Sequence, residues 1–600
     1  MQQFPVANVL SGTLGILVEK DFDRFDAIRG KAKNSFSFVK TLEAFALQGF
    51  TNPSSIVRGD FVAMDMLIEA ILKYASFAKY RLYSYPESLP QITYRLQQQW
   101  ASSTGAAEAV PRSEITAAGD LLAILAPSLM PDAFRLRNIP EGRVIPVIAL
   151  SHGFSKASLL WDCFLKLCLY PTYACDAIIC TSHASRAAML SLLERLEREC
   201  REKFHMKDAV FQGSVHVVPL SVDTDIYCPG HKNKARRALG LPQDAFVALS
   251  LGRISPMKAD LFPLLHVFER LIAANPKQEL ILVISGTKEQ RYADILERYI
   301  SEHSLTKRVR FLCNVSDADK VLLYSAADVF VAIADSVQES FGLAPVEAMS
   351  CGLPQIVSNW DGYRDTVVHG ETGFLVPTYW TQCDTDLGQT DIIFSPETDH
   401  LAVGQSIATD LREFQWRLQM LIDNEELRNR MGRNARRRAE DNYSFEIMTS
   451  QYMDLIKVKI AEANDVIPRD PFLQTGFFST FQGHASHIIS DDTRLKAAFD
   501  IDEATVRRTG MLARAAQSSP LSVDELIVVA VLNVLRRNVD NSIAGTAKEG
   551  LEFTIEQMTS SLRKETGFSI DRITRTIMWL IKQGVVAVHD DYKYRAFLQA

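Results

Sequence analysis

One short stretch, residues 335–354, constrains the fold of this chain more than any other. The apolar run before it, residues 329–334, has the composition and length of a buried strand, and Cys351-Gly352-Leu353-Pro354 is typical of a helix end. Gly342 therefore lies in a turn that leads into a helix of about two to three turns at 343–350. The first amides of such a helix lack internal partners and carry positive potential, so this turn can hold a phosphate.

Two glutamates flank this expected phosphate site. Glu339 precedes the turn and Glu347 lies inside the helix, and their spacing directs both side chains toward one crevice. Ionised carboxylates accept hydrogen bonds from neighbouring hydroxyl groups, so a polyol attached to a phosphate, such as a nucleotide sugar, fits this arrangement. Each glutamate alone has an ordinary explanation, as a charge on the helix dipole or a solvated helix residue. The prediction depends on their combination.

The pattern continues beyond the two glutamates. It reads E-S-F-G-L-x-x-x-E, then A-M-S-C-G-L-P, then D-G-Y-R-D-T-V-V-H-G-E-T-G-F-L-V-P at 361–377. This string resembles the Glu-x7-Glu signature of the retaining family 4 glycosyltransferases. The resemblance covers about residues 1–463. It implies an α/β fold of two Rossmann-like domains facing a cleft (GT-B), and sugar transfer from a nucleotide sugar with retention of configuration, without a metal ion or cofactor.

The resemblance also implies roles for the motif. Glu339 is expected to be catalytic, holding the hydroxyl groups of the sugar, and Glu347 to bind the ribose. The donor diphosphate is expected to contact the backbone amides of four residues: Ser340, Phe341, Gly342 and Leu343. Ser336 matches a serine common in the motif and is a weaker candidate.

A basic pair precedes the motif by two strand–helix units. Arg253 and Lys258 lie in the loop 252–258, after an apolar strand. A guanidinium fork and an ammonium group can converge on a diphosphate and neutralise charge as the nucleoside diphosphate departs. Surface salt bridging is the ordinary alternative, but the spacing G-R-x4-K again matches the family. The resemblance places Asn314 and Val315 beside the nucleotide base.

The first part of the chain offers three further candidates. His152 follows a predicted strand, where open α/β sheets bind ligands, and in the resemblance it is the second catalytic residue, facing the donor sugar. From the residue alone, a histidine that caps a turn is the ordinary alternative. Gly30 lies in a loop that opens a helix and suits a phosphate or the polar end of an acceptor, although the family usually has two glycines there. Arg186 belongs to a T-S-x-x-x-R segment whose arginine faces the cleft in the family.

Composition limits the classes of function. The 600 residues, 47% apolar and 23% charged, are typical of a soluble globular protein with several domains. The net charge of −7 gives no general electrostatic case for nucleic acid, while peripheral membrane contact stays open. Nine cysteines without a C-x-x-C pair argue against disulfides and a zinc site. Since neither a secretory signal nor a membrane span is evident, we expect a cytoplasmic protein.

The pattern of strands, helices and turns predicts the domain organisation. The expected segments are a Rossmann-like acceptor domain (1–220), a linker (221–243), a Rossmann-like donor domain (244–444), a closing helix (445–465), a second linker (466–515) and a winged-helix-like domain (516–600). The donor domain contains an irregular insertion at 379–404, of unknown role.

The C-terminal region lies outside the resemblance to the glycosyltransferases. Its expected elements are three amphipathic helices and a hairpin, at 524–537, 554–566, 569–583 and 585–597, which together resemble a winged helix. DNA binding through Arg572, Arg575 and Lys582 would be the obvious function, but acidic and basic residues are about balanced there. We favour docking of a protein partner or recruitment of the acceptor.

The sequence therefore predicts a retaining, metal-independent glycosyltransferase of the hexosyltransferase type. The acceptor, whether a glycan, a lipid-linked molecule or a peptide, is not readable from the residues. Two alternatives stay open. A phosphorylase would use phosphate in place of a nucleotide on a related fold. A regulatory protein would only sense a nucleotide sugar and act through its C-terminal domain, but the full set of donor-site residues argues against it.

Overall fold

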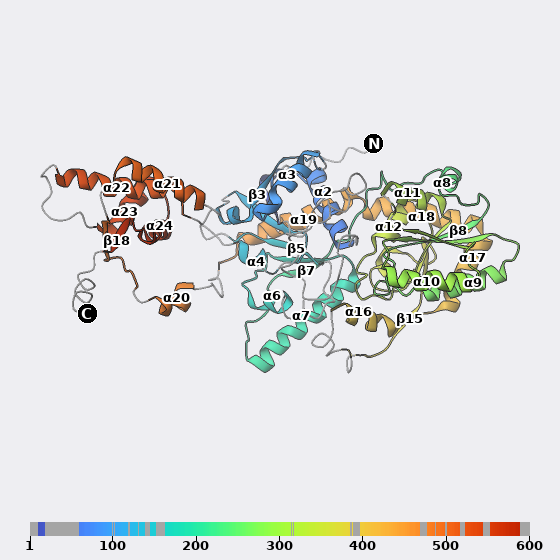
Figure 1. Ribbon diagram of the computed structural model, residues 1–600. Coiled ribbons are helices and arrows are strands. Elements are labelled where there is room, and N and C mark those ends of the chain that lie inside the picture. Colours follow the sequence, from blue (N-terminus) through green and yellow to red (C-terminus); the bar gives the residue numbers. More distant parts are fainter. Residues whose placement is uncertain are drawn as a thin grey trace. The chain divides into compact units, whose positions relative to one another are not determined.

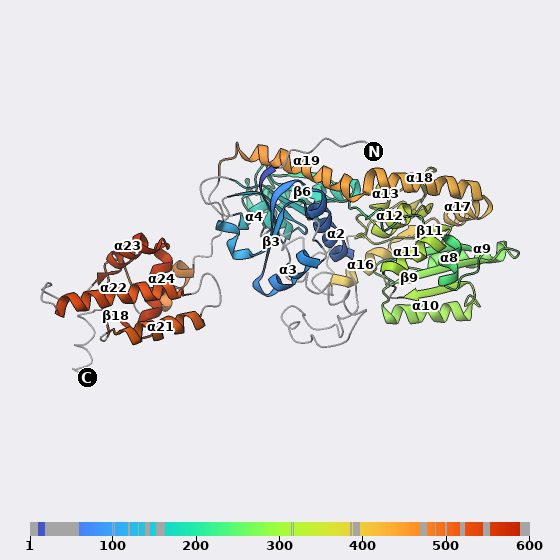
Figure 2. The same cartoon turned by 90° about the horizontal axis from the view of Figure 1, so that it is seen from above.

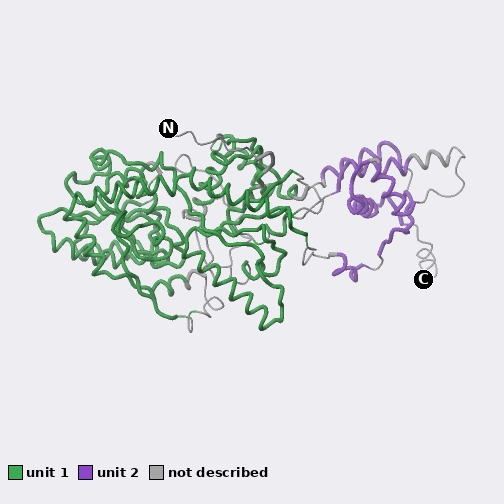
Figure 3. The backbone as a smooth tube through the Cα atoms, turned by 180° about the vertical axis from the view of Figure 1, so that it is seen from behind, with its two compact units in different colours: residues 1–472 green, residues 473–600 purple. Residues whose placement is uncertain are grey.

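The computed structural model of this chain contains two compact units, Met1–Phe472 and Leu473–Ala600 (Figure 3). The residues described are 10–17, 59–98, 163–313, 317–383, 396–468, 477–485, 488–498, 501–516, 523–543 and 553–588, with shorter segments between residues 100 and 151 and the single residues 315 and 387. Unit 1 is built around two parallel sheets, and unit 2 contains a small antiparallel one.

The first sheet of unit 1 has seven strands in the order β3-β2-β1-β4-β5-β6-β7, all parallel (Figure 1). The strands are β1 (Leu10–Leu17), β2 (Phe77–Ser84), β3 (Ala106–Pro111), β4 (Leu121–Ala126), β5 (Val147–Ser151), β6 (Ala177–Cys180) and β7 (Ser214–Val217). The described helices are α2 (Gly59–Tyr74), α3 (Leu89–Gln98), α4 (Ala133–Leu136), α6 (Leu165–Leu169) and α7 (His183–Phe204), with short 3-10 turns at Pro86–Ser88 and Arg112–Ala117. The central strands β4, β5 and β6 are apolar almost throughout, as expected for a sheet covered on both faces.

The second sheet has six parallel strands in the order β10-β9-β8-β11-β12-β13. They are β8 (Phe246–Leu251), β9 (Leu280–Gly286), β10 (Val309–Cys313), β11 (Val329–Ala332), β12 (Gln355–Ser358) and β13 (Gly373–Val376). The accompanying helices are α8 (Lys232–Ala238), α9 (Phe262–Ala274), α10 (Gln290–Glu302), α11 (Asp317–Ala326), α12 (Leu343–Ser350), α13 (Tyr363–Thr366), α17 (Leu411–Asp423) and α18 (Glu425–Tyr443).

Both sheets share one topology, which fixes where a ligand can bind. Numbered within each sheet, the first six strands have the order 3-2-1-4-5-6 of doubly wound nucleotide-binding folds. Such folds bind ligands beyond the carboxyl ends of the strands, where the strand order reverses. In the second sheet this switch point lies between β8 and β11, so the loops that follow these two strands meet there. The predicted α/β fold with two Rossmann-like sheets is confirmed.

The bounds of the elements agree with the sequence predictions where the pattern is local. Helix α12 and strand β12 begin and end at the predicted residues, 343–350 and 355–358. The strand predicted at 329–334 is too long, because β11 ends at Ala332. Beyond that point the Ala334 N–H donates to the side-chain hydroxyl of Ser358 on β12 (3.0 Å) instead of to a backbone carbonyl of a neighbouring strand.

The insertion predicted at 379–404 is partly described. Strands β14 (Thr378–Trp380) and β15 (Ile407–Thr409) form an antiparallel pair, and helix α16 (Pro396–Gln405) leads into β15. The Trp380 ring stands edge-on to the Trp360 ring at 5.4 Å between centroids. This pair of strands therefore contacts the loop that follows β12.

Helix α19 (Phe445–Ala463) matches the predicted closing helix and returns to the first sheet. It packs against α2 and β4, and Figures 1 and 2 both show it beside the elements of the first sheet. The Val222 N–H donates to the Tyr443 carbonyl (2.9 Å), and Lys459 Nζ donates to the Ala174 carbonyl (3.1 Å). One apolar core consequently runs from the first sheet into the second.

In the described part of unit 2, four helices pack around the sheet β17-β16-β18. Its main elements are β16 (Arg494–Ala497), α21 (Glu503–Ala516), α22 (Glu525–Ile543), β17 (Phe553–Thr554), α23 (Ile555–Thr566), α24 (Ile570–Lys582) and β18 (Val586–Val588), preceded by the short α20 (Phe477–Phe481) and a 3-10 turn at Gln482–His484. The sequence pattern predicts a linker at 466–515, but strand β16 and nearly all of helix α21 lie there. These two elements are ordered parts of unit 2 because their apolar side chains complete its core. The second strand of the hairpin predicted at 585–597 begins at residue 592 and lies outside the described residues, so the winged-helix resemblance stays a prediction.

Two further observations concern the hydropathy of the helices and the state of the cysteines. Within the described ranges, no helix combines the length and the hydropathy that crossing a membrane requires. All nine cysteines are free thiols, and five of them are buried.

Candidate functional site

The turn ahead of α12 has a backbone that only glycine adopts easily. Gly342 has φ of +92°, and a Cβ atom there would lie 2.4 Å from Cε1 of the buried Tyr363. Phe341 is 2% exposed, and its ring stands edge-on to the Tyr443 ring at 5.7 Å. Packing on both sides therefore holds the turn at the start of α12, where helix amides without partners point outward.

A second loop is pressed against this turn. The Gly362 N–H donates to the Glu339 carbonyl (3.1 Å), and a Cβ atom at Gly362 would lie 2.4 Å from Cα of Phe341. The loops that follow β11 and β12 thus touch through their backbones. This contact fixes the position of Glu339 relative to both loops.

The structure joins the two predicted binding groups at the switch point. Lys258, from the loop after β8, forms an ion pair with the carboxylate of Glu339, from the loop after β11. Glu339 is 4% exposed, whereas the Lys258 side chain is 32% exposed. A carboxylate this deeply buried requires a compensating cation, and the ammonium group supplies it. Lys258 therefore faces both the interior and the solvent-accessible side of the loop.

The loop that carries Lys258 is itself held by hydrogen bonds. The amides of Gly252 and Ile254 donate to carbonyls of the strand end at β9 (3.0 and 2.8 Å), and the Ser255 hydroxyl donates to Glu289 (2.8 Å). Arg253 lies in the same loop with an exposed side chain. The pair predicted from G-R-x4-K thus shares one ordered loop, with Lys258 directed to Glu339.

The second glutamate of the motif has a different partner. The Tyr324 hydroxyl, on α11, donates to Glu347 Oε2 at 2.6 Å, and both side chains are buried. Burial, and next the Glu347 carboxylate, hold the pKa of Tyr324 well above its usual value. Tyr324 therefore stays protonated and keeps donating, which fixes the orientation of the carboxylate that the sequence assigns to ribose.

Two aspartates beside the motif were missed by the sequence analysis as site residues. Burial raises the pKa of Asp335 to about 6, with the neighbouring Asp260 charge adding to the rise. Burial also raises the pKa of Asp361 to about 7, followed by the effect of the Glu339 charge. Asp335 lies in the stretch 335–354 and Asp361 in the string at 361–377, but nothing in a sequence shows that a carboxyl group is partly buried beside another.

The remaining candidates near the motif have mainly structural contacts. The buried Ser336 accepts the Gln338 N–H at its hydroxyl (3.2 Å) and the Trp360 Nε1–H at its carbonyl (2.8 Å), which shapes the turn. Val315 is partly buried and packs against the main core. Asn314 lies outside the described residues.

The candidates in the first sheet are only partly visible. His152 and Gly30 lie outside the described residues. Arg186 is exposed, and its Nε–H donates to the Val215 carbonyl (2.9 Å) within β7. The arginine therefore bonds to the backbone of its own sheet.

Two contacts, neither predicted, join the loop after β6 to the site. The Thr181 hydroxyl donates to the Ser340 carbonyl (2.9 Å). The His183 N–H at the start of α7 donates to the Asp365 carboxylate (2.5 Å). The first turn of α7 and the turn ahead of α12 therefore lie side by side, although they belong to different sheets.

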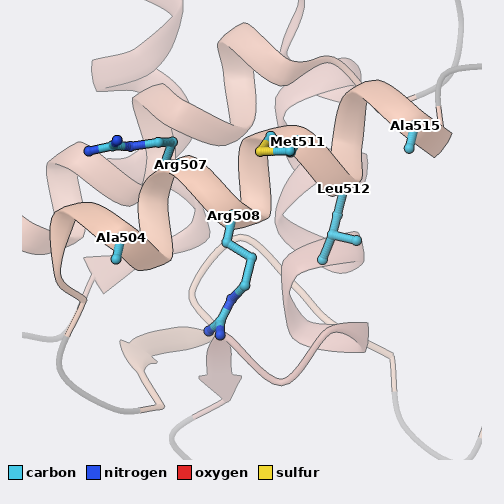
Figure 4. Close-up of a pocket in the computed structure, with 6 residues that line it drawn as sticks. All are labelled: Ala504, Arg507, Arg508, Met511, Leu512 and Ala515. Carbon is cyan, nitrogen blue, oxygen red and sulfur yellow. The ribbon is translucent and has the colours of Figure 1, made fainter.

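Unit 2 presents a different surface. Arg572, one of the predicted DNA contacts, is paired with Asp524 (2.9 Å) and lies over the Phe568 ring (4.8 Å). A shallow hollow along α21, shown in Figure 4, is lined by six side chains of that helix: Ala504, Arg507, Arg508, Met511, Leu512 and Ala515. These side chains supply no acid, base or nucleophile, so the hollow lacks the groups that catalysis needs.

In the part of the chain that the structure describes, no group of three or more His, Cys, Asp or Glu side chains is arranged to hold a metal ion.

Comparisons with known proteins locate the resemblance. Residues 231–385 match the family Glycosyl transferases group 1. The predicted resemblance is thereby confirmed over this part of the chain. The matched range contains the basic loop, the turn ahead of α12 and both glutamates.

Characterised relatives match a similar share of the chain. D-inositol 3-phosphate glycosyltransferase of Mycobacterium tuberculosis is 40% identical over 164 residues, 27% of this chain and 32% of that protein. D-inositol 3-phosphate glycosyltransferase 2 of Catenulispora acidiphila is 36% identical over 169 residues, 27% of this chain and 39% of that protein. The chain thus spans less than half the length of these two relatives.

Solved structures with a similar chain path are more distant in sequence. A sucrose-phosphate synthase from Thermosynechococcus elongatus is 17% identical, with a TM-score of 0.45 over 75% of this chain and 99% of that chain. The Anabaena protein HepE in complex with UDP-glucose is also 17% identical, with a TM-score of 0.45 over 74% of this chain and 100% of that chain.

Proposed function

We propose that unit 1 is a glycosyltransferase that moves a sugar from a nucleotide sugar to an acceptor, with retention of configuration and without a bound metal ion. The observation that carries the proposal is the Lys258–Glu339 ion pair at the switch point of the second sheet, beside the amino end of α12. This position is where doubly wound folds bind nucleotides. The match to Glycosyl transferases group 1 covers the same residues.

The donor diphosphate would bind between the amides of residues 340–343 and the basic loop. Helix amides without partners and an ammonium group both attract phosphate oxygens. Lys258 is partly exposed, so its ammonium can turn from Glu339 toward an incoming diphosphate. Arg253, on the same loop, would add a planar fork of donors.

The two glutamates would hold the sugar and the ribose. Once Lys258 contacts the diphosphate, Glu339 becomes free to accept hydrogen bonds from hydroxyl groups of the sugar. Glu347, held by Tyr324, would accept them from the ribose. His152 would approach the sugar from the first sheet, as the family resemblance implies. Val315 and Asn314 would lie near the base.

In the transfer step, the bond between the anomeric carbon and the phosphate oxygen breaks, and its electron pair goes to the departing phosphate. The charge that grows there meets Lys258 and the amides of α12, which can neutralise it without a metal ion. The acceptor hydroxyl forms the new bond on the face that the phosphate leaves, and its proton passes to the departing phosphate oxygen.

Thermal unfolding with candidate donors tests this proposal. A ligand that binds only the native protein raises the midpoint temperature of unfolding. Among UDP-, GDP- and ADP-sugars, the donor with the right base and sugar should therefore raise this temperature the most. Nucleotide release from the stabilising donor should then depend on an acceptor. D-inositol 3-phosphate is the first to test, because the relatives above carry it in their names. Lys258→Met should abolish the stabilisation, while Arg186→Ala, a matched change of a cation in the other sheet, should keep it.

The outcomes separate the alternatives. The proposal is supported if a nucleotide sugar stabilises the wild-type protein and is used for transfer, and if Lys258→Met loses both the stabilisation and the transfer. Cleavage of a disaccharide that requires inorganic phosphate and no nucleotide would identify a phosphorylase instead. Binding without turnover, combined with a biological effect that survives Glu339→Ala but is lost on deletion of unit 2, would identify a regulatory protein.

A further inference from the structure

Asp361 has a backbone conformation that is unfavourable for its residue type. Its φ is +39°, in the left-handed region that favours glycine. Among the described residues, only His205 and Ser304 are other non-glycine residues with positive φ, and both follow the ends of helices, where this conformation is common. Asp361 instead lies in the loop after β12. Strain of this kind persists where the surroundings impose it, and it gathers at functional sites.

The contacts of the neighbouring residues impose this backbone strain at Asp361. Gly362 is bonded to the Glu339 carbonyl, and Tyr363 fills the space beside Gly342. The Asp361 backbone is therefore clamped against the turn ahead of α12. A side chain in this position stands at the same edge of the sheet as Glu339, and the two charges lie close enough to interact.

The charges around Asp361 determine its protonation. Burial raises its pKa, Glu339 and Asp365 raise it further, and Lys258 and Arg364 oppose them. The result is a pKa of about 7. Lys258 is paired with Glu339, and at a pKa of about 7 about half of the Asp361 carboxyl groups carry a proton at neutral pH. Ionised and protonated carboxyl groups side by side can accept one hydrogen bond and donate another.

We propose that Asp361 is a further sugar-binding residue of the donor site, where its carboxyl group donates a hydrogen bond to an oxygen of the transferred sugar beside the hydroxyl groups that Glu339 holds. This inference rests on the proposed function. The sugar is the partner because a carboxyl group beside Glu339 would repel a diphosphate on ionising, whereas the α12 amides and Lys258 attract one. Asp361 thus helps to select the sugar and leaves the binding of the nucleotide to other groups.

The test compares binding of a nucleotide sugar with binding of the matching free nucleoside diphosphate by isothermal titration calorimetry. Asp361→Gly removes the carboxyl group and suits a positive φ, so the midpoint of thermal unfolding without ligand should stay the same or rise. Its affinity for the nucleotide sugar should fall about tenfold, the worth of one good hydrogen bond, while its affinity for the free diphosphate stays within about twofold of wild type.

Asp361→Asn provides the second variant, because an amide keeps the shape and a hydrogen-bond donor but does not titrate. Wild type should lose affinity for the nucleotide sugar between pH 7 and pH 9, as Asp361 ionises, and Asp361→Asn should keep its affinity over that range. Equal binding of the nucleotide sugar by wild type and Asp361→Gly would overturn this inference and leave the proposed function standing. If wild type bound no nucleotide at all, the proposed function itself would fail.

Discussion

The two sheets of unit 1 have the same strand order but use their polar side chains differently. At the carboxyl edge of the first sheet, Ser182 and Ser185 form a capping box at the start of α7, and Arg186 bonds to a backbone carbonyl of β7. These groups are satisfied within their own sheet. At the same edge of the second sheet, Lys258 and Glu339 come from different loops and bond to each other.

This difference determines which polar side chains at the edge of a sheet are available to a ligand. A side chain that caps a helix or a strand end is bound to the backbone nearby and is not available to a ligand. A pair joined across two loops can separate when a ligand offers each member a better partner. Substitution of Lys258 or Glu339 should therefore affect binding and catalysis strongly, and substitution of Ser182, Ser185 or Arg186 only weakly.

The sharpest test of this contrast is Lys258→Met. Loss of the cation should lower kcat/KM for transfer by about 10²–10³-fold, the range seen when a group that stabilises charge in a transition state is removed. Steady-state kinetics with the donor identified by thermal unfolding measure it. A decrease below about tenfold would mean that the pair is structural and that the contrast between the sheets is false.

Gly342→Ala tests whether packing holds the turn ahead of α12. The new Cβ atom would meet the Tyr363 ring and require an unfavourable φ, so the free energy of unfolding should fall by about 2–4 kcal/mol. Urea denaturation followed by fluorescence measures the change. Gly370→Ala is a suitable control, because its φ of +81° is equally unfavourable but its Cβ atom would meet no atom within 4 Å. Equal losses in both variants would show that φ alone matters and that the Tyr363 contact contributes nothing.

Tyr324→Phe tests the holding of the second glutamate. The substitution leaves the buried Glu347 carboxylate without this donor, which should cost about 1–3 kcal/mol of folding free energy and weaken nucleotide binding. Calorimetry and urea denaturation give the two values. If the affinity for the nucleoside diphosphate were unchanged, Glu347 would have no part in binding the ribose.

The two raised aspartate pKa values predict a pH dependence of stability. The native pKa values of Asp335 and Asp361, about 6 and about 7, lie above the ordinary aspartate value of 3.8. At a pH between 3.8 and these native values, the native state therefore binds more protons than the unfolded state. Their contribution to stability is therefore fully present near pH 4 and is lost as the pH rises to about 7. The thermal midpoint of unit 1, followed from pH 4 to pH 9, should show the decrease, and Asp335→Asn with Asp361→Asn should flatten it. An unchanged slope in the double variant would mean that neither aspartate causes it.

The smallest effect is expected in the first sheet. Arg186→Ala removes one hydrogen bond from an exposed side chain, so the free energy of unfolding should change by about 0.5 kcal/mol or less, and donor affinity should not change. Urea denaturation measures the free energy of unfolding, and calorimetry measures the donor affinity. A loss of donor affinity above about fivefold would show that Arg186 contacts the donor and would remove the contrast between the sheets.

Much of the fold could be predicted because its signals are local. A strand, a turn glycine and a helix end within one short stretch determine α12, and its bounds agree with the prediction. The pairing of Tyr324 with Glu347 and the neighbours of Asp361 could not be predicted, because they depend on how separate helices and loops pack. Strand β16 was also missed, since a short strand of alternating polar and apolar residues has little pattern of its own and is defined by its partners on both sides.

The path of α19 has a consequence for biosynthesis. This helix completes the core around α2, but its residues are translated after the entire second sheet. During synthesis on the ribosome, the first sheet and its helices therefore keep an uncovered apolar surface until residue 463 has left the exit tunnel. A nascent chain that stalls within the second sheet exposes this surface, and it is the form that chaperones would be expected to bind.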